Sequence, residues 1–101
     1  MAEKTPYEFI SKLGQLRDDV FFGDVWEQAD LSKRDRSLIT VAVLASHYRT
    51  DDLCGHMQRA LDNRVTKDES KGLITHIAFY SGWPTTMNAR RVVVDVVGDE
   101  D

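Results

Sequence analysis

Apolar side chains recur along much of the chain at the spacing of an amphipathic helix. From residue 5 to about residue 19 this pattern predicts a helix despite the glycine at position 14. The apolar positions of this stretch are Phe9, Ile10, Leu13 and Leu16. The next ten residues carry an aromatic cluster around Gly23-Asp24, which is typical of an apolar plug at a turn followed by a short helix.

Three helix starts are marked by a hydroxyl residue followed three positions later by an acid. In this arrangement each side chain accepts a hydrogen bond from the backbone N–H of the other residue. The three patterns are Thr5-Pro6-Tyr7-Glu8, Ser32-Lys33-Arg34-Asp35 and Thr66-Lys67-Asp68-Glu69. A fourth helix is predicted from Thr50, because two acids follow in its first turn, where the helix dipole favours them.

The stretch from Leu31 to Ser46 is apolar in nearly every direction around a helical wheel. Its large apolar residues are Leu38, Ile39, Val41, Val43 and Leu44. A helix of this kind has to be covered on all sides, and a chain of 101 residues has little material for that. We therefore expect another copy of the chain to bury the region from Leu38 to Ala45.

Helices are also expected in the second half of the chain. The helix from Thr50 ends at Asp62-Asn63 and the helix from Thr66 ends at Gly82-Trp83-Pro84. Residues 85–97 contain a β-branched run that could form a strand, and we assign a helix because no second strand is predicted for it to pair with. The apolar positions of the first two helices are Leu53, Met57, Ala60 and Leu61, then Leu73, Ile74, Ile77 and Tyr80. The chain is thus predicted to be all-α.

Composition narrows the class of protein. The length indicates one domain over residues 1–101, with an acidic tail at residues 98–101. A formal net charge of −4 provides no basic field for nucleic acid. The single cysteine excludes an internal disulfide and a thiolate zinc cluster, which fits a reducing cytoplasm. No apolar run approaches the roughly 20 residues of a membrane span, and Met1-Ala2-Glu3-Lys4 does not begin a signal peptide. We expect a cytoplasmic protein without nucleic-acid or membrane partners.

The most suggestive chemical group lies on the helix from Thr50. On a helical wheel Arg49, Asp52 and His56 fall within an arc of about 60° beside the apolar stripe. A half-buried imidazole can exchange a proton near neutral pH, and an acid one turn earlier can orient it or raise its pKa. The alternative is a solvated Asp/His pair that only supports the helix.

Several other side chains could bind a substrate, although each could also have a purely structural role. His76 and Tyr80 are one helical turn apart and could donate to an anion, or could satisfy each other at a helix interface. Arg36 could clamp a carboxylate or form a surface ion pair. Trp83 could roof a pocket, although aromatic clusters are more often core. Cys54 lies about 160° around the wheel from His56, so the imidazole cannot activate this thiol. The three histidines have no metal-site spacing, and no metal is expected.

With these residues placed, the chain resembles the carboxymuconolactone decarboxylase family. The resemblance covers about residues 21–89, and its motifs appear in the order of the family. The four stretches that carry it are Arg34 to Ala42, Leu53 to His56 with Ala60 to Asn63, Val65-Thr66 with Glu69, and Ala78 to Pro84. It implies an alkylhydroperoxidase-like bundle of about five to six helices that assembles into a ring, as a homotrimer or homohexamer.

The family has two chemical branches, and the chain resembles the one without a cysteine pair. The alkylhydroperoxidase-like branch carries CxxCxxxH and a glutamate on the preceding helix. Aligned on His56, the two cysteine positions are Arg49 and Asp52, and the glutamate position is Ser37. The thiol relay of a peroxidase is therefore absent. One further departure is Arg64, where the family usually has a glycine after the helix. A non-glycine residue in the left-handed region costs of order 1 kcal/mol, so we expect a different loop or that conformation at Asn63.

The resemblance implies a lyase that removes CO₂ from 4-carboxymuconolactone in aromatic catabolism, without a metal or organic cofactor. His56 takes the acid/base role from the family alignment, with Asp52 behind it. Geometry and charge suggest that Arg36 or Arg49 binds a substrate carboxylate and that His76, Tyr80 and Trp83 contact the lactone. Two alternatives are an alkylhydroperoxidase-like antioxidant protein, which the missing cysteine pair disfavours, and a ring-forming binding protein without turnover.

Overall fold

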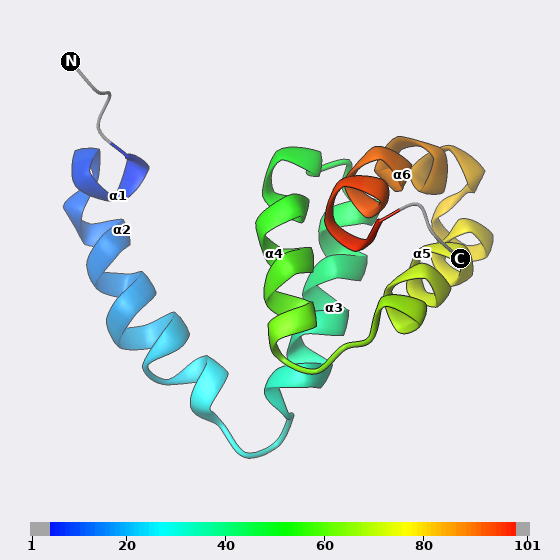
Figure 1. Ribbon diagram of the computed structural model, residues 1–101. Coiled ribbons are helices and arrows are strands. Elements are labelled where there is room, and N and C mark those ends of the chain that lie inside the picture. Colours follow the sequence, from blue (N-terminus) through cyan, green and yellow to red (C-terminus); the bar gives the residue numbers. More distant parts are fainter. Residues whose placement is uncertain (1–4, 99–101) are drawn as a thin grey trace. The chain divides into compact units, whose positions relative to one another are not determined.

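The computed structural model describes residues 5–98, and the predicted tail beyond Gly98 lies outside the described residues. The chain divides after Lys33 into an N-terminal unit and a helical unit that begins at Arg34. The single domain over residues 1–101 stays a prediction. Every regular element of residues 5–98 is helical, which confirms the all-α prediction (Figure 1). No helix in this range is long and apolar enough to span a membrane.

The N-terminal unit contains four short helical segments instead of the predicted continuous helix. They are α1 (Pro6–Phe9), α2 (Ser11–Leu16), the π-helix η1 (Arg17–Phe22) and the 3₁₀-helix η2 (Val25–Glu27). The break falls at Ile10, whose backbone (φ −119°, ψ 87°) is not helical. The Arg17 guanidinium lies 4.1 Å from the centre of the Tyr7 ring, in a cation–π contact. A straight helix would hold these two side chains about 15 Å apart along its axis.

Three predictions for the N-terminal unit have different outcomes. The Oγ1 atom of Thr5 accepts a hydrogen bond from the Glu8 N–H at 3.2 Å, which confirms the predicted cap. The aromatic plug is also present, because Trp26 is buried and its ring centre lies 6.1 Å from the ring centres of both Phe21 and Phe22. The predicted apolar stripe is not a buried face. Its four members are between 42% and 79% exposed, since so short a unit has few apolar partners of its own.

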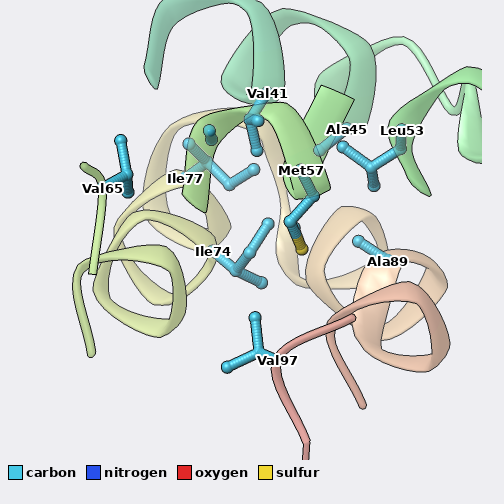
Figure 2. Close-up of a cluster of buried hydrophobic side chains, with 10 residues drawn as sticks. Val41, Ala45, Leu53, Met57, Val65, Ile74, Ile77, Ala89 and Val97 are labelled. Carbon is cyan, nitrogen blue, oxygen red and sulfur yellow. The ribbon is translucent and has the colours of Figure 1, made fainter. Parts of the chain in front are cut away.

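The helical unit consists of four helices that agree closely with the sequence pattern. They are α3 (Lys33–Ser46), α4 (Thr50–Asp62), α5 (Lys67–Ser81) and α6 (Trp83–Val97). Helix α6 settles the ambiguous valine-rich segment as a helix and begins two residues before the predicted start. Figure 2 shows the core, in which side chains from α4, α5 and α6 converge with two from α3. Leu53 and Met57 of α4 are completely buried at its centre.

Helix α3 is covered on one side. Val41 and Ala45 are buried, whereas Ile39 is 50% and Val43 49% exposed. The remaining apolar residues of α3 are partly buried against the core. This distribution leaves an apolar flank outside the core of one copy, and its burial by a second copy stays a prediction.

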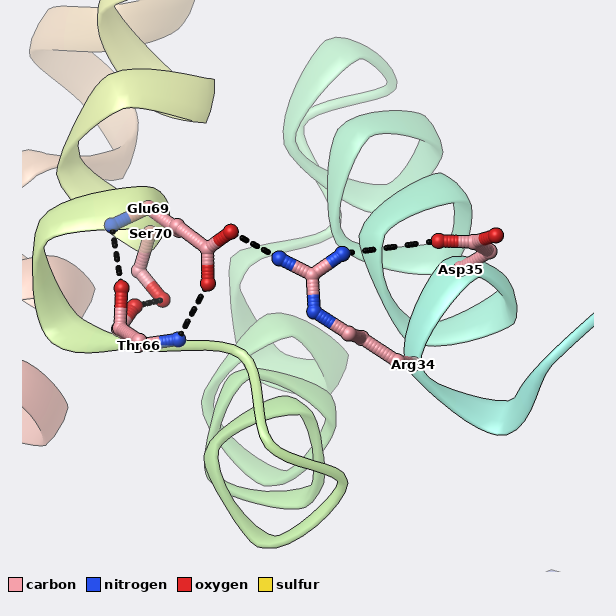
Figure 3. A network of polar contacts seen from close by, with 5 residues as sticks. All are labelled: Arg34, Asp35, Thr66, Glu69 and Ser70. Carbon is pink, nitrogen blue, oxygen red and sulfur yellow. Dashed lines mark hydrogen bonds and ion pairs between the residues drawn. The ribbon is translucent and has the colours of Figure 1, made fainter.

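The segment before α5 carries a polar network that joins α3 to α5 (Figure 3). Thr66 and Glu69 form the predicted reciprocal cap, with hydrogen bonds of 2.9 and 3.0 Å to each other's backbone N–H. The Glu69 carboxylate also pairs with the Arg34 guanidinium. The expectation for the preceding loop was wrong: Arg64 itself adopts the left-handed conformation (φ 77°), and Asn63 does not (φ −89°). Asn63 instead donates from Nδ2 to the buried Ser37 hydroxyl at 2.9 Å.

Candidate acid/base site on helix α4

His56 lies in the middle of α4, beside the completely buried Met57. The side chain is half-buried, between the core-facing stripe and the exposed face of the helix. Burial lowers the pKa of His56 below its ordinary value of 6.5, and the positive charge of Arg59 lowers it further. The Asp52 carboxylate opposes both effects but is the weakest of the three. The imidazole is therefore mainly neutral at pH 7. Asp52 does raise the pKa, as the sequence analysis expected of an acid one turn earlier, but this effect is smaller than the two that lower it.

Arg59 is the residue that the sequence analysis missed. It follows His56 by three positions on α4, so both side chains lie on the same side of the helix. Arg59 is half-buried, and its Nη1 atom is fully covered. The signal was present in the sequence, because a cation at i+3 is as close to a histidine as an acid at i−4.

The two arginines suggested as carboxylate ligands occupy different places. Arg49 is exposed at the start of α4, where its carbonyl oxygen accepts hydrogen bonds from the N–H groups of Asp52 and Leu53. Arg36 lies in the first half of α3 and is half-buried, with its Nε atom covered. Its carbonyl oxygen accepts a hydrogen bond of 2.8 Å from the Thr40 hydroxyl. Arg36 and Arg59 are thus cations held partly out of water, where an anion interacts with them more strongly than at the surface.

His76 and Tyr80 lie in the second half of α5, and Trp83 begins α6. The structure brings His76 and Tyr80 together, whereas Trp83 contacts Phe79. The rings of His76 and Tyr80 have centres 5.0 Å apart, and Trp83 packs edge-on against Phe79 at 6.1 Å. Tyr80 is 81% and Trp83 63% exposed, so neither is a core residue. The assignment of Tyr80 to the buried stripe was wrong, because its position points about 100° from the centre of the buried face of α5.

A separate groove of about 620 Å³ lies along α4 and α6. It is lined by the exposed Cys54 and by Asp51 and Thr50 from the first turns of α4, opposite polar residues of α6 such as Arg91 and Asp95. His56 is not part of its lining. The structure therefore separates the thiol from the imidazole, as the helical wheel predicted. Among residues 5–98 no group of three or more histidine, cysteine and acidic side chains could hold a metal ion.

Comparison with known proteins identifies the family of the chain. The model of the carboxymuconolactone decarboxylase family matches residues 11–95. The chain belongs to this family. It is 40% identical over 78 residues to the 4-carboxymuconolactone decarboxylase of Acinetobacter baylyi, an alignment that covers 77% of this chain and 58% of the relative. It is also 30% identical over 78 residues to the nitrosuccinic acid decarboxylase npaB of Metarhizium robertsii, covering 77% of this chain and 54% of that protein.

The chain spans little more than half the length of these two curated relatives. Both relatives are named as decarboxylases, and their named substrates are different carboxylic acids. The match establishes the family of the chain and agrees with the resemblance seen in its motifs.

Proposed function

We propose that this protein is a decarboxylase that acts on a small carboxylated lactone of the 4-carboxymuconolactone type without a cofactor. The observation that carries the proposal is the 40% identity to a 4-carboxymuconolactone decarboxylase. The half-buried His56 between an arginine and an aspartate on one helix provides a chemical group suited to such a reaction. A cytoplasmic location is part of the proposal, since the chain carries one cysteine.

Decarboxylation breaks the bond between a carbon atom and the carboxylate and leaves an electron pair on that carbon. The electron pair needs an adjacent acceptor in the substrate, and the carbon then needs a proton. In our proposal His56 supplies this proton and recovers one from water after each turnover. The free imidazole is neutral at pH 7, but a bound carboxylate places a negative charge nearby and raises its pKa. Substrate binding thus protonates the acid that the reaction consumes.

Three arginines of the helical unit are candidates for binding a substrate carboxylate. We assign a substrate carboxylate to Arg36 or Arg49, and the structure adds Arg59 as a third candidate. Of the two on or beside α4, Arg59 is closer to His56 than Arg49, because it is one helical turn away on the same helix. In the proposal Asp52 orients the imidazole from the preceding turn.

The proposal also assigns contacts with the lactone to His76, Tyr80 and Trp83. Their rings present a hydroxyl group, an imidazole and an indole N–H at the α5–α6 junction, all of which can donate to a carbonyl oxygen. Replacing Tyr80 by phenylalanine removes one donor and preserves the ring. If Tyr80 binds the lactone, the Tyr80→Phe change raises KM for the lactone more than it changes kcat.

We further propose that the protein is a homotrimer or homohexamer. The support is the apolar flank of α3, where Ile39 and Val43 are half exposed within one copy. Side chains of this kind at helical spacing are typical of a surface that is buried in an assembly. Sedimentation velocity tests this part, and a monomer at micromolar concentration contradicts it.

The reaction is tested by incubating the full chain with 4-carboxymuconolactone and following lactone absorbance together with released CO₂. We expect one CO₂ per lactone consumed, without added metal or cofactor. A parallel assay with an organic hydroperoxide and a dithiol reductant tests the peroxidase alternative, which predicts a rate that the Cys54→Ala change abolishes. Binding of the lactone without CO₂ release supports the non-catalytic alternative and contradicts the proposal.

A further inference from the structure

The groove along α4 and α6 takes no part in the proposed function. The two helices pack against each other (Figure 1), and the groove of about 620 Å³ lies along them. Its α4 wall contains Thr50, Asp51 and Cys54, and its α6 wall is formed by side chains from Met87 to Asp95. Sites that hold small organic ligands have volumes of roughly 300–1,000 Å³. The groove is therefore large enough for a second binding site, apart from the candidate acid/base site.

Four charged side chains of both signs line the groove. Asp51 lies on the α4 wall, whereas Arg90, Arg91 and Asp95 lie on the α6 wall. None of the four forms an ion pair within the part of the chain that the structure describes. Arg91 and Asp95 are four positions apart on α6, a spacing at which opposite charges often pair, yet no ion pair joins them. The groove thus presents charges of both signs to a ligand.

This mixture of charges selects the class of ligand. An anion such as a dicarboxylate would lie against the two aspartates, and a cation would lie against the two arginines. An uncharged apolar molecule would remove all four charges from water without giving any of them a partner, which is costly. A zwitterion gives a partner to charges of both signs, because its carboxylate accepts from an arginine and its ammonium group donates to an aspartate.

The length of the groove indicates a ligand longer than one amino acid. The α6 wall extends over eight residue steps from Met87 to Asp95, which is about 12 Å along the helix axis. An extended peptide advances about 3.3 Å per residue, so three to four residues span this wall. Met87 and Val92 supply apolar contact, and Thr50 and Asn88 can hydrogen-bond peptide groups.

We propose that the α4–α6 groove binds a short peptide of three to four residues that has a free amino terminus and a free carboxyl terminus. Arg91 binds the terminal carboxylate, and Asp95 binds the terminal ammonium group. Cys54 lies beside the peptide and makes no interaction on which binding depends. The proposal concerns a ligand and a site that differ from those of the proposed decarboxylation.

Arg91 and Asp95 are assigned to the termini because the other two charges already have local interactions. The Nη1 atom of Arg90 donates to the Met87 carbonyl oxygen at 3.3 Å. Asp51 lies in the first turn of α4, where the helix dipole favours an acid. Asp95, in contrast, lies in the last turn of α6, where the dipole disfavours a negative charge. A bound ammonium group compensates for this unfavourable position.

The single cysteine of the chain provides a direct measure of occupancy. Cys54 is exposed and lines the groove, so a bound peptide shields its thiol from a reagent in solution. The full chain is treated with iodoacetamide at increasing concentrations of trialanine, and mass spectrometry follows the alkylated fraction with time. Trialanine amide lacks the free carboxylate, N-acetyl-trialanine lacks the ammonium group, and L-alanine has both charges without the length.

The variants are Arg91→Gln and Asp95→Asn, each of which removes one charge and keeps a side chain of similar size. Their matched controls are Lys67→Gln and Asp62→Asn, which remove exposed charges outside the groove. Each rate of alkylation is compared with that of the same protein without peptide, so a change in the intrinsic reactivity of Cys54 does not affect the result. Circular dichroism at 222 nm establishes that each variant is folded.

We expect trialanine to bind with a dissociation constant of order 1 mM, so that about 4 mM slows alkylation of the wild type about 5-fold. L-alanine and both blocked peptides should need at least about 10-fold higher concentrations, because each loses charge-assisted or peptide contacts. Arg91→Gln should bind trialanine and trialanine amide equally, and Asp95→Asn should bind trialanine and N-acetyl-trialanine equally. Both controls should behave as the wild type.

Three results overturn the inference. The first is unchanged alkylation of the wild type at about 40 mM trialanine, ten times the concentration given above. The second is equal protection by trialanine and both blocked peptides, and the third is wild-type protection in both variants. The same assay with 4-carboxymuconolactone separates the two proposals, because this dianion should leave Cys54 unprotected. Protection by the lactone and not by trialanine makes the groove a substrate site and contradicts the peptide assignment, whereas loss of decarboxylase activity leaves it intact.

Discussion

Truncation of Leu53 to alanine is the sharpest test of the core that supports the acid/base helix. Leu53 is completely buried on α4, one turn before Met57, and belongs to the cluster drawn in Figure 2. Removal of a fully buried leucine side chain loses its transfer free energy and leaves a cavity, for a cost of about 3 kcal/mol within a usual range of 2–5 kcal/mol. For a domain of this size each kcal/mol lowers the melting temperature by about 4–8 °C, so we expect a decrease of about 12–24 °C.

The measurement is urea denaturation followed by circular dichroism at 222 nm, with thermal denaturation as a second readout. The matched control is Ile39→Ala on α3, where the side chain is 50% exposed. In dilute protein the control should lower the free energy of unfolding by less than about 1 kcal/mol. A loss below 1 kcal/mol for Leu53→Ala contradicts the described core. A cost for Ile39→Ala that grows with protein concentration supports burial of α3 in an assembly.

Three further predictions concern His56 and the two ends of the α4–α5 loop. The pKa of His56 is lower in the folded chain than in the unfolded chain, so the unfolded chain binds more protons below about pH 6.5. The free energy of unfolding should therefore fall as the pH drops below this value and level off below the folded pKa. A His56→Gln variant should lack this dependence, and equal pH profiles for the two proteins contradict the prediction. Arg64→Gly should raise stability by of order 1 kcal/mol, because the backbone of Arg64 is left-handed, and a lower urea midpoint refutes this. Thr66→Ala should lower the free energy of unfolding by about 1 kcal/mol, because the hydrogen bond from the Glu69 N–H to the Thr66 hydroxyl is lost. An unchanged urea midpoint would mean that this cap contributes nothing to stability.

The helices of the second half were predictable because local signals agree there. The Thr66 cap, the acids after Thr50 and the spacing of buried residues along α4 each specify a helix without reference to the rest of the chain. The break at Ile10 was not predictable in this way. It accompanies a contact between Tyr7 and Arg17, which lie ten positions apart and meet only when the chain bends.

The chemistry of the candidate site was predictable in part. Its histidine was found from the family motif and its acid from helical spacing. The direction of the pKa shift was not, because it depends mainly on how deeply His56 is buried. The helical wheel indicates a half-buried position for His56, but the balance between the effect of burial and the charges of Arg59 and Asp52 depends on the packing of the whole unit. The exposed position of Tyr80 was missed because a tyrosine at the border of the apolar stripe of α5 can lie either in the core or in solvent.

Turnover of 4-carboxymuconolactone by the wild type, His56→Gln and Cys54→Ser decides whether this chain is a decarboxylase that works through His56. The two variants change neighbouring positions on the same helix, one in the candidate site and one in the separate groove. We predict that the wild type and Cys54→Ser release CO₂ at the same rate and that His56→Gln is slower by at least about 100-fold, the usual contribution of a positioned acid or base. Absence of turnover by the wild type, or full turnover by His56→Gln, contradicts the proposal.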